Sequence, residues 1–236
     1  GAARLTLSGT NSSLSGPVLS SAGPAVPASG LGLNAAVIIS NVNALGTGPI
    51  TIGAVPNLRA IEFSLTGGAS VTNTINLPTD PAAAQVGIQG NSSSTSYGLS
   101  GKISGGSSGL VFFFDMGNMQ SAGIARLSNA DNDFKAGTIH VNRGVLAITS
   151  DSVLGDPGNV LKTYQSGTAG ALRFDAPNIN IARQIMMSAG CGLDVRGDNS
   201  GDGAVDTSND ATISGNMGET AVTAVPWTVR GGSQTN

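Results

Sequence analysis

Residues 61–65 read Ile61-Glu62-Phe63-Ser64-Leu65, and this alternation of apolar and polar side chains decides the fold class. The same period of two recurs in residues 71–77 and 179–187. Successive side chains of a β-strand point to opposite faces, so each segment is expected to bury one face. Turn-prone pieces separate the segments, such as residues 45–49 (LGTGP) and 156–159 (DPGN). The sequence therefore predicts an all-β protein with strands of roughly three to seven residues, Gly/Asn/Ser-rich turns and no α-helix.

The composition is that of a turn-rich protein that folds. Gly supplies 35 of 236 residues, and charged residues reach only 11%, where about a quarter is typical of soluble domains. A hydrophobic share of 39% and a net charge of −3 do not fit intrinsic disorder. The 11 basic residues form no cluster, and no apolar run reaches the roughly 18 residues of a membrane helix. Neither nucleic-acid binding nor a membrane-spanning segment is therefore expected.

Two apolar features are expected to lie in the core. Cys191 is the single cysteine and has Gly190 and Gly192 as neighbours, which supply no charge that would activate a thiolate. It is expected to be a small buried residue. Residues 110–114 (LVFFF) are expected to form a strand buried on both faces rather than an exposed patch for a partner.

An internal repeat with an offset of about 110 residues favours stacked coils over an antiparallel sandwich. Three pairs of segments follow one another in the same order: residues 43–48 (NALGTG) with 152–157 (SVLGDP), 60–63 with 171–174, and 102–105 with 212–215. Aromatic residues make up only 4% of the chain, whereas a sandwich tends to use aromatic anchors. We expect one β-solenoid over residues 1–236, built of two imperfect super-repeats at about 4–110 and 126–220, with a third beginning near residue 230.

Three segments carry a further signal: residues 5–11 (LTLSGTN), residues 43–48 (NALGTG) and residues 136–146 (AGTIHVNRGVL). Together they resemble a known family, the autotransporter-associated β-strand repeat of bacterial surface proteins. The resemblance implies a right-handed parallel β-helix (β-solenoid), export to the outer cell surface, and roles in adhesion, aggregation or display. It brings no catalytic residues with it. The chain departs from the family pattern in the proline-rich residues 16–29 and in the acidic stretch that begins at Asp198.

That acidic stretch, residues 198–210, resembles a calcium-binding loop. Oxygen ligands at its first, third and fifth positions, glycine at the sixth and a carboxylate at the ninth follow the EF-hand pattern. The twelfth position is Asn209 instead of a carboxylate, and Asp210 follows one residue late. A calcium site and a solvated acidic loop both remain open, and no cofactor is required for the fold. The candidate ligands are Asp198, Ser200, Asp202, Asp206 and Asp210.

Catalytic constellations are sparse. The only histidine, His140, lies between Ile139 and Val141 and is expected to face solvent on the side opposite to them. Cleavage of a glycosidic bond needs two carboxyl groups that converge on one groove. The candidate pairs are Asp131 with Asp133 and Asp151 with Asp156. A carbohydrate-active β-helix enzyme, similar to a polysaccharide lyase or a tailspike, is therefore the alternative interpretation.

The leading interpretation is a secreted or cell-surface structural or adhesive rod that is not an enzyme. Its partners are expected to be surface glycans or receptors and further solenoid coils, because solenoid ends expose unpaired backbone groups and the open end of the core. Residues 4–7 read as a repeat strand and residues 221–229 as an apolar strand, and neither end resembles a polar cap. End-to-end association with copies of itself into a filament, or with adjoining repeats, is the expected consequence.

Overall fold

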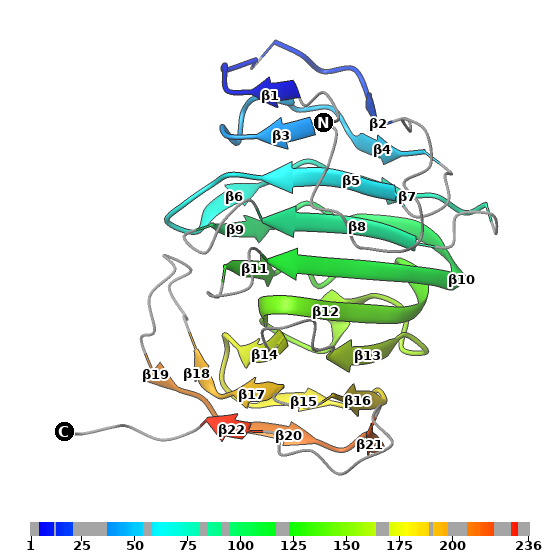
Figure 1. The fold of residues 1–236 in the computed structure, drawn as a ribbon, viewed down its shortest axis with the longest axis vertical. Coiled ribbons are helices and arrows are strands. Elements are labelled where there is room, and N and C mark those ends of the chain that lie inside the picture. Colours follow the sequence, from blue (N-terminus) through cyan, green and yellow to red (C-terminus); the bar gives the residue numbers. More distant parts are fainter. Residues whose placement is uncertain are drawn as a thin grey trace.

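Figure 1 shows the computed structural model as a stack of strands that run across the long axis of the molecule. The structure describes residues 5–11, 13–20, 37–53, 58–80, 85–90, 95–116, 123–163, 170–188, 191–197, 207–219 and 228–230. Apart from one 3-10 turn at Ser152–Leu154, every regular element in these ranges is a strand. The all-β fold class predicted from the sequence is confirmed.

Most strands belong to three parallel sheets that share two long strands. Sheet 1 contains β1 (Leu5–Leu7), β3 (Val37–Ile39), β5 (Leu58–Phe63), β8 (Gln85–Gly90), β10 (Ile103–Met116), β12 (Lys135–Ile148), β13 (Val160–Thr163), β16 (Ile185–Met187) and β21 (Met217–Glu219). Sheet 2 contains β6 (Ala69–Val71), β9 (Ser96–Leu99), β11 (Ile124–Leu127), the second half of β12, β14 (Gly170–Phe174), β17 (Gly192–Asp194) and β22 (Thr228–Arg230). Sheet 3 contains β2 (Val18–Ser20), β4 (Ile50–Ile52), β7 (Ile75–Leu77) and the first residues of β10.

Two short pairs lie outside these sheets. β15 (Ile179–Ile181) pairs in parallel with β20 (Ala211–Ile213). β18 (Arg196–Gly197) and β19 (Thr207–Ser208) form the one antiparallel pair among the described strands.

The register shows that each circuit of the chain returns to the same sheet one strand further along. Residues that are neighbours in sheet 1 are 32 positions apart at Leu5 and Val37 and 22 positions apart at Ile139 and Leu161. Parallel pairing at this separation requires the chain to travel around a coil between the two strands. The fold is therefore a parallel β-helix, in agreement with the stacked coils that the internal repeat favoured.

The core is a continuous column of aliphatic and aromatic side chains inside the coils. Phe112 and Phe114 of β10 and Ile139 and Val141 of β12 have no exposed surface, and Phe134 packs edge-on against Phe112 with ring centroids 5.4 Å apart. The buried sets predicted in residues 61–65, 71–77 and 179–187 all lie in this core. Val111 and Phe113 are only half-buried, so residues 110–114 bury one face rather than two. Cys191 is buried, as predicted.

Strands β10 and β12 are 14 residues long, so the predicted upper length of about seven residues is wrong for them. Each of these strands bends from one sheet into another while it stays hydrogen-bonded to strands of neighbouring coils. β10 pairs with β7 through Ile103 and with β8 from Val111 onwards. The length follows from the corner, since Gly105, Gly106 and Gly144 have positive φ angles and allow the chain to bend while it remains paired.

The turns at residues 43–48 and 152–157 have equivalent geometry. Gly46 and Gly155 have φ angles of 66° and 72°, and each donates its N–H to the residue three positions earlier over 3.1 Å. A Cβ at Gly155 would lie 2.4 Å from the carbonyl oxygen of Phe134 in the preceding coil. Glycine is required here both by the left-handed backbone and by this close approach.

The 110-residue offset relates the equivalent corners at residues 43–48 and 152–157, but the strands near them lie in different sheets. β5 lies in sheet 1 and contains residues 60–63, whereas the matching residues 171–174 lie in β14 of sheet 2. Similarly, β7 belongs to sheet 3, and β16, which has the corresponding sequence position, belongs to sheet 1. Equivalent segments of the two super-repeats are thus displaced by one sheet around the coil.

Candidate functional site

The β18–β19 pair joins residues 196–197 to residues 207–208, on either side of most of the predicted calcium loop. Asp198, Ser200, Asp202 and Asp206 lie outside the described residues, and Asp210 is exposed. The base of the loop is held by Asn209, whose N–H donates to the Val195 carbonyl over 2.6 Å and whose Nδ2 donates to the Phe174 carbonyl over 2.9 Å. Within the described residues no three His, Cys, Asp or Glu side chains are placed to hold a metal ion. Asn209, at the twelfth position of the candidate loop, is a structural anchor.

We expect that removal of calcium by a chelator leaves the melting temperature of the protein unchanged. The anchoring bonds of Asn209 join the base of the loop to backbone carbonyls of the stack. A calcium titration followed by NMR should therefore shift only signals from residues 198–210. Global unfolding in chelator, followed by circular dichroism, would contradict this expectation.

Three of the four carboxylates considered for catalysis have a partner in an ion pair or a turn. Asp133 pairs with Lys102 over 2.7 Å, and this hydrogen bond, together with that from Ser104, holds the pKa of Asp133 below its ordinary range. Asp131 is exposed. Asp151 accepts from Arg183 over 2.8 Å, and Asp156 accepts the Gly158 N–H inside its own turn. Asp133, Asp151 and Asp156 are thus engaged in ion pairs or a turn.

Arg183 links its own turn to the turn at residues 151–159, and its role was not recognised from the sequence. It is only 3% exposed, although it is the polar residue between the apolar positions Ile181 and Ile185. Its guanidinium reaches the Asp151 carboxylate and the backbone oxygens of Asp151, Leu154, Gly155, Asp156 and Asn159 at 2.8–3.5 Å. The planar fork of Arg suits several acceptors in one plane.

A second cluster of buried charges lies on sheet 2. Arg173 donates two hydrogen bonds to the Asp175 carboxylate, from Nε over 2.6 Å and from Nη2 over 2.8 Å. Arg126, two strands away, approaches the same carboxylate at 3.3 Å. The Asp175 side chain has no exposed surface, so this two-arginine pairing balances the cost of removing the carboxylate from water.

A third polar cluster lies on the outer side of sheet 1. Gln89 Nε2 donates to Glu62 Oε2, and both side chains are buried, at 3% and 2% exposed. Asp115 occupies the next position of this row, and Arg143 the one after it. The sequence placed Glu62 opposite the core correctly, but alternation does not report whether the outer face is open to water.

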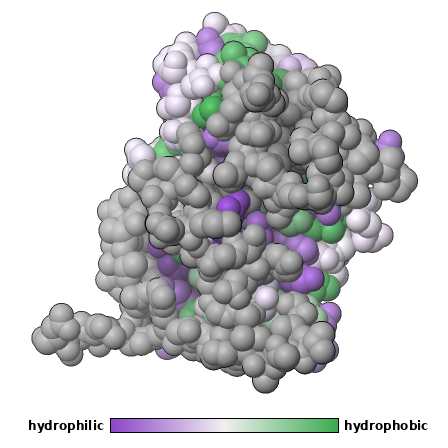
Figure 2. Space-filling model, viewed as in Figure 1, coloured by the Kyte–Doolittle hydropathy of each residue, from purple (hydrophilic) through white to green (hydrophobic). Residues whose placement is uncertain are grey.

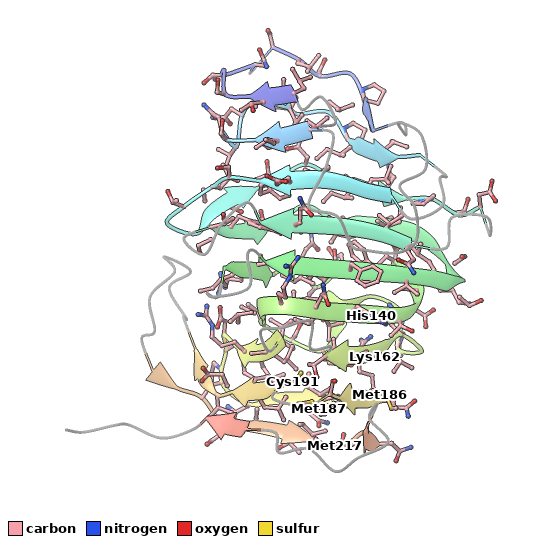
Figure 3. The ribbon with its side chains drawn as sticks, viewed as in Figure 1. His140, Lys162, Met186, Met187, Cys191 and Met217 are labelled. Atoms are coloured by element: carbon pink, nitrogen blue, oxygen red, sulfur yellow. The ribbon has the colours of Figure 1, made fainter. Side chains whose placement is uncertain are left out.

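His140 also lies on the outer side of sheet 1, between Phe113 of β10 and Lys162 of β13 (Figure 3). Its ring meets the Phe113 ring edge-on with centroids 4.7 Å apart. Burial, and secondarily the charge of Lys162, lower the pKa of His140 to about 4. The side chain points away from Ile139 and Val141 as predicted, but it is half-buried and neutral at pH 7 instead of solvated.

The low pKa of His140 predicts a loss of stability in mild acid. The unfolded chain takes up the proton near pH 6.5, whereas the folded chain resists it until about pH 4. The contribution of His140 is therefore complete above pH 6.5 and is lost progressively as the pH falls toward about 4. Thermal melts across this range should show a steeper decline for the wild type than for His140→Gln. Identical slopes in the two proteins would contradict the assignment.

The exposed large hydrophobic side chains of the described residues lie at the two ends of the stack. Among the described residues only three large hydrophobic side chains are exposed: Leu5 at 57%, Leu14 at 43% and Met217 at 43%. Leu5 belongs to β1 and Met217 to β21, the two edge strands of sheet 1. Figure 2 shows hydrophobic surface at the top of the molecule, over the first strands. The ends are thus the apolar candidates for contact with another protein surface.

No helix in the described part of the chain combines the length and hydropathy of a membrane span. Comparison of the chain with protein-family models, with curated proteins and with solved structures finds no match. The geometry of the molecule is therefore the basis for its functional interpretation.

Proposed function

We propose that the chain is a rigid segment of a secreted or surface-displayed structural or adhesive rod, and that it is not an enzyme. The observation that carries the proposal is the use of its buried charges. Arg183 bonds turns of neighbouring coils, and Arg126 and Arg173 from different strands of sheet 2 share Asp175. These groups hold one coil to the next instead of meeting in a cleft. Their geometry supports a protein selected for axial cohesion.

The dimensions of the stack support the same role. Sheet 1 has nine strands, and neighbouring strands lie about 4.8 Å apart, so the sheet is about 40 Å high. Each coil adds backbone hydrogen bonds along the same axis. Location on the cell surface and adhesion to glycans or receptors follow from the resemblance to autotransporter repeats and remain part of the proposal.

The test combines electron microscopy, glycan-array binding and degradation assays on the purified chain. We expect rods, saturable binding to a surface glycan class, and no release of shortened products from a panel of polysaccharides. Antibody labelling of intact source cells should detect the protein on their outer face. Catalytic release of oligosaccharides, or labelling only after cell lysis, would overturn the respective parts of the proposal.

One observation favours the alternative of a carbohydrate-active enzyme. Glu62, Gln89, Asp115 and Arg143 occupy successive register positions of one row across sheet 1. Glu62 and Arg143 are, however, 2% and 6% exposed, so a polysaccharide does not reach them in this arrangement. If degradation is detected, its loss in Glu62→Gln with retention of the wild-type melting temperature would assign the activity to this row.

A further inference from the structure

The corner before each strand of sheet 3 shows how two successive coils pack against each other. Gly48-Pro49 precedes Ile50 of β4, and Gly16-Pro17 precedes Val18 of β2, which is the register partner of Ile50. A Cβ at Gly48 would lie 2.0 Å from the carbonyl oxygen of Gly16. Because Gly48 does not have a positive φ, it is the approach of the preceding coil that requires glycine there.

Gly16 occupies the same corner in the first coil, but its surroundings are open. No atom lies within 4 Å of the position that a Cβ of Gly16 would take, and its φ is not positive either. Nothing among the described residues explains why this corner carries glycine. The glycine would be explained if a carbonyl group of a further coil lay against Gly16, in the same way as the Gly16 carbonyl lies against Gly48.

The corner has a direction. At Gly101, Gly155 and Gly215, as at Gly48, the would-be Cβ meets a carbonyl oxygen of the coil that precedes it in the chain. At these corners each glycine therefore faces the preceding coil in the chain, and each corner carbonyl faces the following coil. The first coil therefore fits the forward side of a last coil and not the glycine side of another first coil.

The apolar interior is open at the same places. Leu5 pairs in register with Val37, and Met217 pairs with Ile185, so both exposed side chains continue inward-facing rows of sheet 1. β1 and β21 are opposite edges of one parallel sheet, and Figure 1 shows them at opposite ends of the stack. An edge of this kind is a template for another strand.

From these features we propose that the first coil docks on the last coil of a second copy, with β1 parallel to β21 and Leu5 beside Met217. The contact is head-to-tail and therefore extends into a filament unless its rotation closes a ring. This inference rests on the proposed rod and specifies its partner. Backbone hydrogen bonds between β1 and β21 continue sheet 1 across the junction. A backbone carbonyl of the neighbouring copy lies in the open space beside the Cα of Gly16.

The experiment blocks each face separately in the full chain. Leu5→Lys and Gly16→Leu alter the first coil, and Met217→Lys alters the last. Leu5 and Met217 are exposed and Gly16 is unopposed, so the folded monomer should tolerate all three changes. Gly109→Leu is the matched control, because Gly109 also has no atom within 4 Å of its would-be Cβ but lies in β10, away from the ends. Circular dichroism checks each fold.

Analytical ultracentrifugation of the wild type and Gly109→Leu should show concentration-dependent growth. Each face-blocking variant should weaken association by at least about tenfold, since an unpaired charge or a bulky side chain would be buried. A mixture of Leu5→Lys with Met217→Lys should form heterodimers and nothing longer, because one intact face remains on each copy. Electron micrographs of wild-type filaments should show diffraction at about 4.8 Å along the axis.

Several outcomes would overturn the inference. Homodimers of Met217→Lys alone would indicate a head-to-head contact through the first coil. A wild type that stays monomeric at every concentration would exclude the second copy as occupant and assign the faces to further coils of one polypeptide. A monomeric rod about 40 Å high would still satisfy the proposed function, whereas detection of polysaccharide degradation would contradict that function and leave the assembly result standing.

Discussion

Replacement of Arg183 by Met is expected to destabilise the protein by about 3 kcal/mol. The substitution removes the charge that faces Asp151 at 2.8 Å and leaves five backbone oxygens without this donor. Asp151 keeps some contact with water, since its side chain is 23% exposed, so the loss should fall at the lower end of the range for broken buried pairs. Urea denaturation of wild type and variant measures the difference.

Two variants separate the charge of Arg183 from its geometry. Arg183→Lys keeps the charge but loses the planar fork, and should recover only part of the stability. Lys102→Met removes the exposed partner of Asp133 and should change stability by less than about 1 kcal/mol. Equal losses at Arg183 and Lys102 would show that the bonds of Arg183 to the neighbouring turns are unimportant.

The role of Arg183 could have been predicted from the internal repeat, although the apolar/polar alternation does not indicate it. The offset of about 110 residues pairs Arg183 with Asn73 and Gly155 with Gly46. Asn73 Nδ2 donates to the carbonyls of Gly46 and Gly48 at 3.0 Å and 2.7 Å, and Arg183 donates to the carbonyls of Gly155 and Asp156. The same corner is therefore held by an amide in one super-repeat and a guanidinium in the other.

Strand positions followed from local physics, whereas outer-face burial did not. Alternation in residues 61–65 reports which side chains face inward, because that depends only on the backbone period. Whether Glu62 faces water depends on packing against the outer face, and no local pattern records it. For the same reason His140 was placed on the correct side but in the wrong environment: its low pKa results from burial against neighbours such as Phe113, which is distant in sequence.

The length of β10 and β12 depends on a similar non-local effect. Glycines such as Gly105 and Gly144 look like turn residues in the sequence, and turns were expected to end the strands. In the structure these glycines bend the backbone while the neighbouring coils keep the ladder paired on both sides of the corner. Because the coils stack, a glycine that would otherwise end a strand forms a bend within one continuous strand.

The second large effect is expected at Phe134, between β11 and β12. Phe134→Ala should cost about 3–5 kcal/mol, because it removes a ring with no exposed surface from the middle of the core. The ring packs edge-on against Phe112. The stacked coils above and below restrict collapse of the cavity, so little of the loss should be recovered. Urea denaturation with an unchanged slope would report the change in stability.

Phe113→Ala is the matched control for Phe134→Ala, because it removes the same ring from the outer side of sheet 1. Phe113 is half-buried against His140, so its removal should cost about 1 kcal/mol and leave the core intact. It should also raise the pKa of His140 from about 4 toward 6.5, since burial is the main cause of the low value. NMR titration of the His140 ring measures this shift. If the two alanine variants lose equal stability, the interior of the coils is not the main source of cohesion, and the outer faces must contribute as much as the core.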